Sequence, residues 1–220
     1  ERRGAFSLAG IFALRMLGLF LILPVFALYA EGLPDSTPML VGMAIGVYGL
    51  SQALLQIPFG MLSDRVGRKP VLFAGMLIFI GGSILCGLAT EMWQLIAFRG
   101  LQGLGAGAIV PVTLTIIGDL YPPAERARVQ ALFGSLFVLA FLIGPTLGGI
   151  FTDTIGWRWV FYINLPISLL AIVVVWRFMP SLYYEGPRQR IDVAGMVLFG
   201  GLPLALLGGC DDDGEGAEQQ

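Results

Sequence analysis

The sequence predicts an all-α membrane protein built from a bundle of membrane-spanning helices, and three observations support this class. Hydrophobic residues make up 56% and charged residues 13% of the 220 positions, whereas soluble domains carry roughly 25% charged residues. The apolar residues gather in long runs that short polar segments separate. Runs such as VLFAGMLIFIGGSILCGLA do not alternate between polar and apolar residues, so they indicate helices rather than strands of a transmembrane barrel.

Seven of these runs can cross a bilayer, which takes about 20 helical residues. We expect the first six to form a six-span bundle over residues 1–180, followed by a cytoplasmic linker at 181–190, a seventh span and an acidic tail at 210–220. The chain does not begin with Met and stops soon after the seventh run, so we expect a fragment or a truncation. The predicted spans are 7–30, 39–61, 70–88, 92–118, 129–151, 157–178 and 191–209.

Basic residues predict which way the chain crosses the membrane. Ten of the 13 Lys and Arg residues lie at the N-terminus and in every second polar segment, whereas Arg158 alone lies in the segments between them. The positive-inside rule therefore places the N-terminus in the cytoplasm and the acidic tail outside. The two remaining basic residues, Arg15 and Arg99, lie within predicted spans.

Rare residue types exclude several classes of function. The sequence has no histidine and a single lysine, Lys69, so we expect neither histidine catalysis nor a Walker A nucleotide site. Cys86 and Cys210 are too few for a disulfide framework or a cysteine metal site, and a net charge of -2 argues against nucleic acid as a partner. Residues 103–108 fit G-x-G-x-x-A, but they lie in an apolar run without a helix terminus in water. We therefore predict a protein that is not an enzyme and has no metal or cofactor.

A short polar pattern occurs twice and indicates an internal repeat. The pattern G-x-[LF]-[ST]-D-x-[VI]-G-x-[KR] spans residues 60–69 and again residues 149–158, at an offset of 89 positions. Three predicted spans separate the two copies, so they lie on opposite sides of the membrane. Two inverted repeats of three helices are an arrangement from which transporters build a site that opens to each side in turn.

The first copy combines groups that suit a conformational switch at the cytoplasmic water boundary. Glycines permit tight turning and close helix approach, and a carboxylate among cationic groups forms charge-assisted hydrogen bonds that can break and re-form. Membrane anchoring alone would need basic residues but not this fixed order. We therefore predict a switch loop over residues 60–70 that uses Gly60, Asp64, Arg65, Gly67, Arg68 and Lys69.

Polar residues within the predicted spans are candidates for function or for contacts between helices. Arg99 shares a helix face with Gln102, and because a buried arginine is costly we predict a functional role rather than snorkelling to water. For Arg15, attraction of anionic groups and snorkelling remain alternatives. Polar residues recur at i, i+4 and i+8 on the second predicted span and form a stripe on one helix face. This stripe either lines a substrate cavity or forms hydrogen bonds to a neighbouring helix, and it consists of Tyr48, Gln52 and Gln56.

Glycine and proline mark a further candidate region in the fifth predicted span. Pro145 frees a backbone carbonyl and should bend the helix, while Gly144 and Gly148 form a small-xxx-small pair that permits close packing. The same spacing, for which we expect ordinary helix packing, recurs in the pairs Gly42/Gly46 and Gly103/Gly107.

Together these segments resemble motifs of the major facilitator superfamily, and the resemblance covers nearly the whole chain. Motif A of this family is similar to the segment GMLSDRVGRKP, and motif B of the fourth span is similar to RGLQGLGAG. Motif C, the antiporter motif of the fifth span, is similar to IGPTLGG. LGLFLILPV fits the first span of drug exporters. GWRWVFYINLPI resembles the fourteen-span drug:proton antiporters, whereas the opening spans look more like twelve-span exporters. The residues that match motifs B and C are Arg99, Gln102, Gly103 and Gly105, and Gly144, Pro145, Gly148 and Gly149.

The resemblance implies a six-helix N-terminal bundle plus a seventh span, within a secondary transporter of the bacterial inner membrane. Such a protein would export drugs or other amphipathic molecules in exchange for protons, with Arg99, Gln102 and Gly103 modulating proton transfer. The implied partners are membrane lipid, a small-molecule substrate, protons and a missing C-terminal bundle or second chain, against which Asp64 would work. The chain departs from the family pattern at Ala27, Ala131 and Ala140.

Three possibilities remain for the acid that carries the proton, because the acidic residues of this chain lie at or beyond the ends of the predicted spans. The coupling acid belongs to the missing half, or an edge acid such as Glu31 is drawn inward, or the coupling differs. A second hypothesis is that this chain does not transport by itself. It would then be a truncated or engineered half-bundle that needs a second six-span domain.

Cysteine labelling tests the predicted orientation. We expect a cysteine in place of Arg65 to react with a membrane-impermeant maleimide from the cytoplasmic side, and a cysteine in place of Arg158 to react from the opposite side, because three spans separate them. Intact cells and inverted vesicles provide the two compartments, with Cys86 and Cys210 replaced by Ser. Labelling of both positions from one compartment would contradict the inverted repeat.

Overall fold

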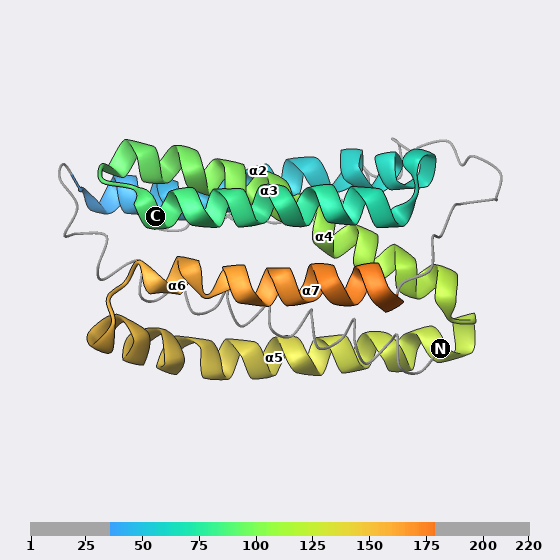
Figure 1. Cartoon of the computed structure of the whole chain (residues 1–220). Coiled ribbons are helices and arrows are strands. Elements are labelled where there is room, and N and C mark those ends of the chain that lie inside the picture. The colour runs from blue at the N-terminus through green and yellow to red at the C-terminus, as the bar shows by residue number, and fades with distance from the viewer. Residues whose placement is uncertain (1–35, 179–220) are drawn as a thin grey trace, which may run out of the picture. The chain divides into compact units, whose positions relative to one another are not determined.

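Helices account for the regular structure that the computed structural model describes, which covers residues 36–178 (Figure 1). Strands are absent from that range. The predicted spans 7–30 and 191–209, the linker and the acidic tail lie outside it. The described helices are α2 (Pro38–Val66), α3 (Arg68–Leu88), α4 (Met92–Leu120), α5 (Pro123–Thr154), α6 (Trp159–Tyr162) and α7 (Asn164–Phe178).

Five helical segments between residues 36 and 178 are long and apolar enough to cross a membrane. Four of them are α2, α3, α4 and α5, and the fifth joins α6 to α7 over residues 159–177. Because lipid offers no hydrogen-bond partner to the backbone, a crossing segment satisfies its own N–H and C=O groups by forming a helix. The predicted all-α membrane class is therefore confirmed, and the five segments coincide with predicted spans two to six.

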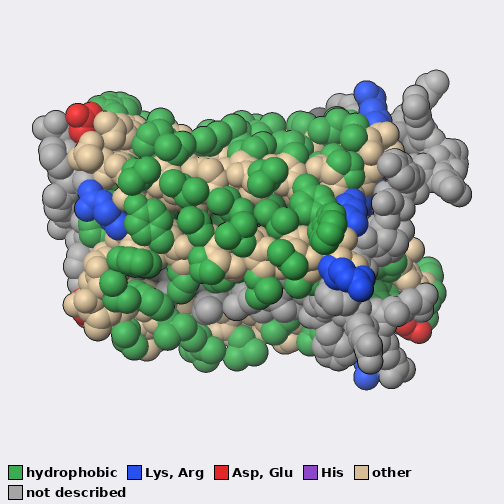
Figure 2. Space-filling model, viewed as in Figure 1, with side chains coloured by type: hydrophobic (Ala, Val, Ile, Leu, Met, Phe, Trp, Pro, Cys, Tyr) green, Lys and Arg blue, Asp and Glu red, His purple; other side chains and the backbone are tan. Residues whose placement is uncertain are grey.

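The surface in Figure 2 separates apolar from charged side chains. Hydrophobic side chains cover its middle, and charged side chains gather toward two opposite ends. On α2, Leu50 and Leu54 are 60% and 65% exposed, and on α5, Phe141 and Leu142 are 59% and 71% exposed. An apolar band of this kind suits a covering of lipid or of further apolar helices.

One end of the bundle carries most of the described basic residues, and we call it the basic end. It comprises the end of α2, the start of α3, the α4–α5 turn and the end of α7 (Figure 1). Helices α2 and α5 extend past their predicted limits there, to Val66 and back to Pro123. A proline in the first turn fits a helix start because its missing N–H would have had no helical partner. The basic residues of this end are Arg65, Arg68, Lys69, Arg126, Arg128 and Arg177.

The predicted loop over residues 60–70 is largely helical, so that expectation was wrong. Gly60 and Asp64 belong to the last turns of α2, the interruption is confined to Gly67, and Arg68 begins α3. Gly67 has φ of 107°, a conformation that L side chains rarely adopt. A single glycine reverses the chain, and therefore helices rather than a flexible loop hold the flanking side chains.

The second copy of the polar pattern turns the chain in the same way. Gly156 has φ of 106° and lies 89 positions after Gly67, which is the offset of the sequence pattern. Ser63 and Thr152 are related by the same offset, and both are buried. Each of their hydroxyl groups donates to a carbonyl of its own helix, at 2.7 and 2.8 Å respectively. The repeat thus extends from the sequence to the backbone conformation.

Helix α4 packs at backbone distance against both α2 and α3. A Cβ built on Gly103 of α4 would lie 2.5 Å from the carbonyl oxygen of Tyr48 in α2. A Cβ built on Gly75 of α3 would lie 2.6 Å from the Cβ of Ala108 in α4. Small residues permit such approach, and in lipid it stabilises helix pairs through van der Waals contact.

The predicted packing role of the glycine pairs is confirmed for one pair and not for the other. A Cβ on Gly107 would lie 2.9 Å from the carbonyl oxygen of Gln52, so Gly103 and Gly107 both press α4 onto α2. A Cβ added to Gly42 or Gly46 would meet no atom within 4 Å, since the face of α2 that they occupy is turned away from α4. Spacing alone does not say which face of a helix meets a partner.

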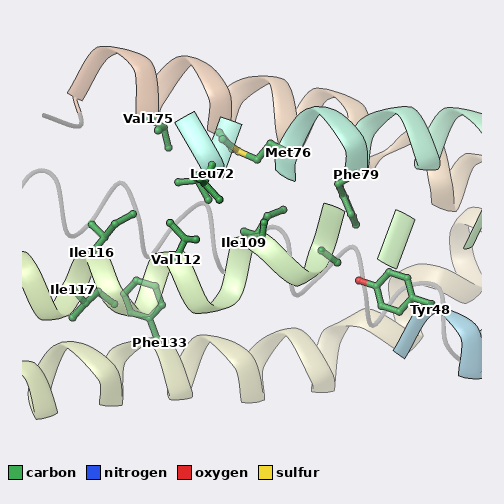
Figure 3. Close-up of a cluster of buried hydrophobic side chains, with 14 residues drawn as sticks. Tyr48, Leu72, Met76, Phe79, Ile109, Val112, Ile116, Ile117, Phe133 and Val175 are labelled. Atoms are coloured by element: carbon green, nitrogen blue, oxygen red, sulfur yellow. The ribbon is translucent and has the colours of Figure 1, made fainter. Parts of the chain in front are cut away.

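Apolar side chains fill the space around α4 where five helices contribute to one core (Figure 3). They come from α2, α3, α4, α5 and α7, so residues far apart in the sequence share one core. The labelled members of this core are Tyr48, Leu72, Met76, Phe79, Ile109, Val112, Ile116, Ile117, Phe133 and Val175.

Helix α5 continues through Pro145 without interruption. Its buried residues include Ala140, Gly144, Gly148 and Thr152, which recur every four positions and so share one face. The burial of Gly144 and Gly148 agrees with the close packing expected of them. The bend at Pro145 remains a prediction.

Adding one methyl group at the α3–α4 contact tests this packing. Gly75→Ala should lower the thermal unfolding midpoint in detergent, because the new Cβ meets Ala108 and overpacking costs roughly 1–3 kcal/mol. Gly81 lies on the same helix with no atom within 4 Å, so Gly81→Ala is the matched control and should leave the midpoint unchanged or raise it. Equal midpoints for the two variants would contradict the close contact.

Candidate functional site

A buried arginine joins three helix ends at the basic end. Arg68 is 2% exposed, and its Nε donates to Oδ2 of Asp119 at the end of α4, at 3.0 Å. Its Nη1 donates to Oγ of Ser63 at 2.8 Å and to Oδ1 of Asp64, both in the final turns of α2. The guanidinium group therefore ties α2, α3 and α4 together at one point.

The two carboxylates of this cluster meet water, whereas the guanidinium group does not. The side chains of Asp64 and Asp119 are 49% and 30% exposed. Water can replace Arg68 as a partner of either carboxylate, but opening both contacts would separate a buried cation from two counter-charges, which is costly. The planar five-donor guanidinium suits several simultaneous acceptors. We therefore expect two states of the cluster. In one, Arg68 binds both carboxylates, and in the other both bonds are broken and Arg68 has moved toward water.

The remaining residues of the predicted switch lie around this cluster with different roles. Gly60 accepts a hydrogen bond from Ser63 Oγ through its carbonyl, at 2.7 Å, and so helps to orient a partner of Arg68. Arg65 is exposed in the last turn of α2. Lys69 Nζ donates to the backbone carbonyl of Trp176 in α7, at 3.0 Å. The structure thus brings Asp64 and Arg68 together and directs Lys69 to another helix.

Sequence reasoning missed Asp119 as a member of this site. A signal for it existed, because Asp119 directly follows the fourth apolar run, on the membrane side where Arg68 lies. An acid at that boundary faces three nearby basic residues of the motif. The distance of 51 positions between Asp119 and Arg68 hid the pairing, which depends on how α4 packs against α3.

A second polar network lies inside the bundle around Arg99, in the first third of α4. The residue is 1% exposed, and its Nη1 donates to Oε1 of Gln102 at 2.9 Å. Its Nε donates to the backbone carbonyl of Ala44 in α2 at 3.4 Å, and its guanidinium group lies 4.3 Å from the ring centre of Tyr48. Gln102 Nε2 donates to Oγ of Ser83 in α3 at 2.7 Å. The network therefore links α2, α4 and α3.

Burial of Arg99 decides against the snorkelling alternative. Among the described partners of its guanidinium group, the Ala44 carbonyl, the Gln102 amide and the Tyr48 ring are uncharged, and they solvate the cation with dipoles and a π face. Because an arginine stays protonated in proteins, this network holds a fixed positive charge inside an apolar bundle. Such a charge alters the energy of any proton or ion that approaches it.

The structure assigns Tyr48 of the polar stripe to a helix contact, because it is buried against α4 beside Arg99. Gln52 and Gln56 are half-buried, and their role in a substrate cavity remains a prediction. Gly103 packs on α2, so the described geometry gives it a packing contact within the predicted proton-coupling group. Arg15 lies outside the described residues.

The residues of motif C occupy two settings on α5. Gly144 and Gly148 are buried, whereas Gly149 has no atom within 4 Å of an added Cβ. The role of this group in antiport stays a prediction. In the described stretch from 36 to 178, no three His, Cys, Asp or Glu side chains gather as a metal site.

A membrane bundle with an inverted sequence repeat is an architecture that many secondary transporters share. The sequence profile of the major facilitator superfamily matches residues 8–208. The chain belongs to the major facilitator superfamily.

Two curated relatives illustrate the match. The inner membrane transport protein YajR of Escherichia coli (strain K12) is 41% identical over 181 residues, which are 82% of this chain and 39% of that protein. Multidrug resistance protein 3 of Bacillus subtilis (strain 168) is 45% identical over 139 residues, which are 63% of this chain and 27% of that protein. The chain thus spans well under half the length of these relatives.

Solved structures agree on the fold. The crystal structure of the peptide transporter POT in complex with sulfate superposes with a TM-score of 0.71 at 22% identity, covering 93% of this chain and 45% of that one. The human organic anion transporter MFSD10 (TETRAN) gives a TM-score of 0.68 at 20% identity, covering 90% of this chain and 52% of that one. At these identities the likeness extends to the fold alone.

Removing either carboxylate tests the cluster at the basic end. Asp119→Asn and Asp64→Asn should each lower the free energy of unfolding by roughly 1–3 kcal/mol, because each removes one charge-assisted hydrogen bond to Arg68. Glu125→Gln is the control, since Glu125 is an exposed acid at the same end. Thermal and denaturant unfolding in detergent measure the effect. If Asp119→Asn has the same unfolding midpoint as the unmodified chain, the ionic cluster does not stabilise the bundle.

Proposed function

We propose that this chain is the N-terminal bundle of a proton-coupled exporter of drugs or other amphipathic molecules, located in a bacterial inner membrane with its N-terminus in the cytoplasm. The observation that carries the proposal is the fixed positive charge of Arg99, buried and hydrogen-bonded within a membrane bundle of this family. A relative named as a multidrug resistance protein supports the class of substrate.

The ionic cluster supplies the conformational part of this proposal. Asp64, Arg68 and Asp119 join the ends of α2, α3 and α4, at the end of the bundle that the basic residues assign to the cytoplasm. Movement of the neighbouring helix ends would exchange these bonds for contacts with water or with another helix. The cluster then favours one conformation of the bundle, and its opening allows the other.

Arg99 supplies the electrostatic part. It cannot carry a proton in a cycle, because a guanidinium group does not deprotonate in proteins. Its positive charge stabilises the ionised form of a nearby carboxylate and so favours release of the proton from that group. Arg99 can therefore control the step at which a coupling acid loses its proton. Among residues 36–178, the acids Asp64, Glu91, Asp119, Glu125 and Asp153 all lie at helix ends. We therefore place the coupling acid in another part of the transporter.

The exposed faces of α2 and α5 favour the related proposal that this chain alone does not transport. Large apolar side chains such as Leu54 and Leu142 are 65% and 71% exposed. The curated relatives that match are far longer than the matched stretch. A second six-span bundle with apolar helices would cover these faces and complete a path through the membrane.

Proteoliposomes with an internal pH dye test both statements. We expect no drug-induced pH change with this chain alone. When the chain is joined to the remaining sequence of the Escherichia coli relative, addition of a lipophilic cationic drug should shift the luminal pH. Arg99→Gln in the joined protein should reduce the rate of that shift at least about tenfold, which equals about 1.4 kcal/mol.

Arg128→Gln provides the matched control, since it removes an exposed positive charge outside the network. It should leave the rate of the pH shift unchanged. Drug flux that is independent of the pH gradient would reject proton antiport. Flux by this chain alone would reject the need for a second bundle.

A further inference from the structure

Lys69 caps the end of a helix that belongs to the other repeat. It is the second residue of α3, and its Nζ lies 3.0 Å from the backbone carbonyl oxygen of Trp176 in α7. Trp176 lies in the last described turn of α7, and the residue four positions later is Pro180, which has no N–H to offer the Trp176 carbonyl. The cation therefore sits at the negative end of the helix dipole of α7.

Arg158 makes the same kind of contact at the opposite end of the same helix pair. It directly precedes α6, and its Nη2 donates to the carbonyl oxygen of Ala89 at 3.0 Å. Ala89 is the C-cap residue of α3, and the last turn of α3 has no basic residue of its own. The Arg158 guanidinium also lies 4.7 Å from the ring centre of Trp157, which limits its freedom to move.

The two contacts are related by the internal repeat. Arg158 follows Lys69 by 89 positions, the offset of the polar pattern and of the two positive-φ glycines. The acceptors, Ala89 and Trp176, are 87 positions apart, and each belongs to the end of the third predicted span of its repeat. Each repeat therefore provides the cation that caps the third helix of the other.

We propose that Lys69 and Arg158 form a reciprocal clamp that fixes α3 and the α6–α7 segment to each other at both ends. The two segments run antiparallel, because α3 starts where α7 ends. A contact at one end alone would permit sliding or splaying at the other. Contacts at both ends fix the register, so the pair moves as one unit when other helices rearrange. Lys69 and Arg158 act as positioning residues, whatever the transported substrate is.

The second copy of the polar pattern has a function under this proposal. It lacks a basic residue at the position of Arg68, where Trp157 stands, and so it cannot form a cluster like that of Asp64 and Asp119. It keeps the last basic position of the pattern, and that residue caps a helix as Lys69 does. Both copies therefore share capping by this basic residue in addition to the positive-φ glycine and the buried hydroxyl group.

Hydrogen exchange of the complete chain in lipid nanodiscs tests the clamp with spatial resolution. Lys69→Gln should speed amide exchange about three- to tenfold in the last turn of α7, where the uncapped carbonyls let the helix end fray. Arg158→Gln should have this effect in the last turn of α3. Arg128→Gln removes an exposed charge elsewhere on the basic end and should change exchange at neither turn.

Conservative variants complete the test and remain informative if a glutamine variant does not fold. Lys69→Arg and Arg158→Lys keep a cationic donor at each position, so both acceptor turns should retain the exchange rates of the unmodified chain. Loss of protection in these variants would overturn the proposal. It would also be overturned if Lys69→Gln and Arg158→Gln left their acceptor turns unchanged, or if each loosened the whole bundle uniformly.

Discussion

Backbone-distance contact along α4 is the constraint on which the rest of the bundle depends. Lipid does not drive helices together through exclusion of water, so a helix pair needs many close van der Waals contacts. Gly103 and Gly107 supply them toward α2, while Gly75 of α3 admits Ala108 from the opposite side. With α4 fixed in this way, its polar residues meet partners on both neighbours. Arg99 reaches α2, and Gln102 reaches Ser83 of α3.

The same helix packing gives the two buried arginines different surroundings, one within the bundle and one at the water boundary. Arg99 is enclosed where helices touch along their lengths, and its solvation by dipoles and an aromatic ring makes it a permanent feature of the interior. Arg68 is equally buried, but its acidic partners lie at the water boundary. A permanent interior charge suits control of proton energetics, and a boundary cluster suits a change of conformation. These two settings correspond to the electrostatic and the conformational parts of the proposed function.

The sequence predicted the parts of this fold that depend on local composition. Apolar run length located spans two to six, and the repeated pattern marked the two segments in which the structure has a glycine with positive φ. It could not predict that Gly103 packs while Gly42 does not, because spacing does not define which face meets a partner. Asp119 was missed for a related reason, since its pairing with Arg68 exists only after α4 docks on α3. The expected loop at 60–70 was wrong because one glycine suffices for the reversal.

The contact between Arg158 and Ala89 has a consequence for synthesis of the chain. The two residues are 69 positions apart, so α3 leaves the ribosome well before its cap does. During that interval the carbonyl groups at the end of α3 have water as their partner, and the first triplet of helices lacks a brace at that end. Under the clamp proposal, the second repeat therefore supplies a contact that the first repeat lacks when it is synthesised.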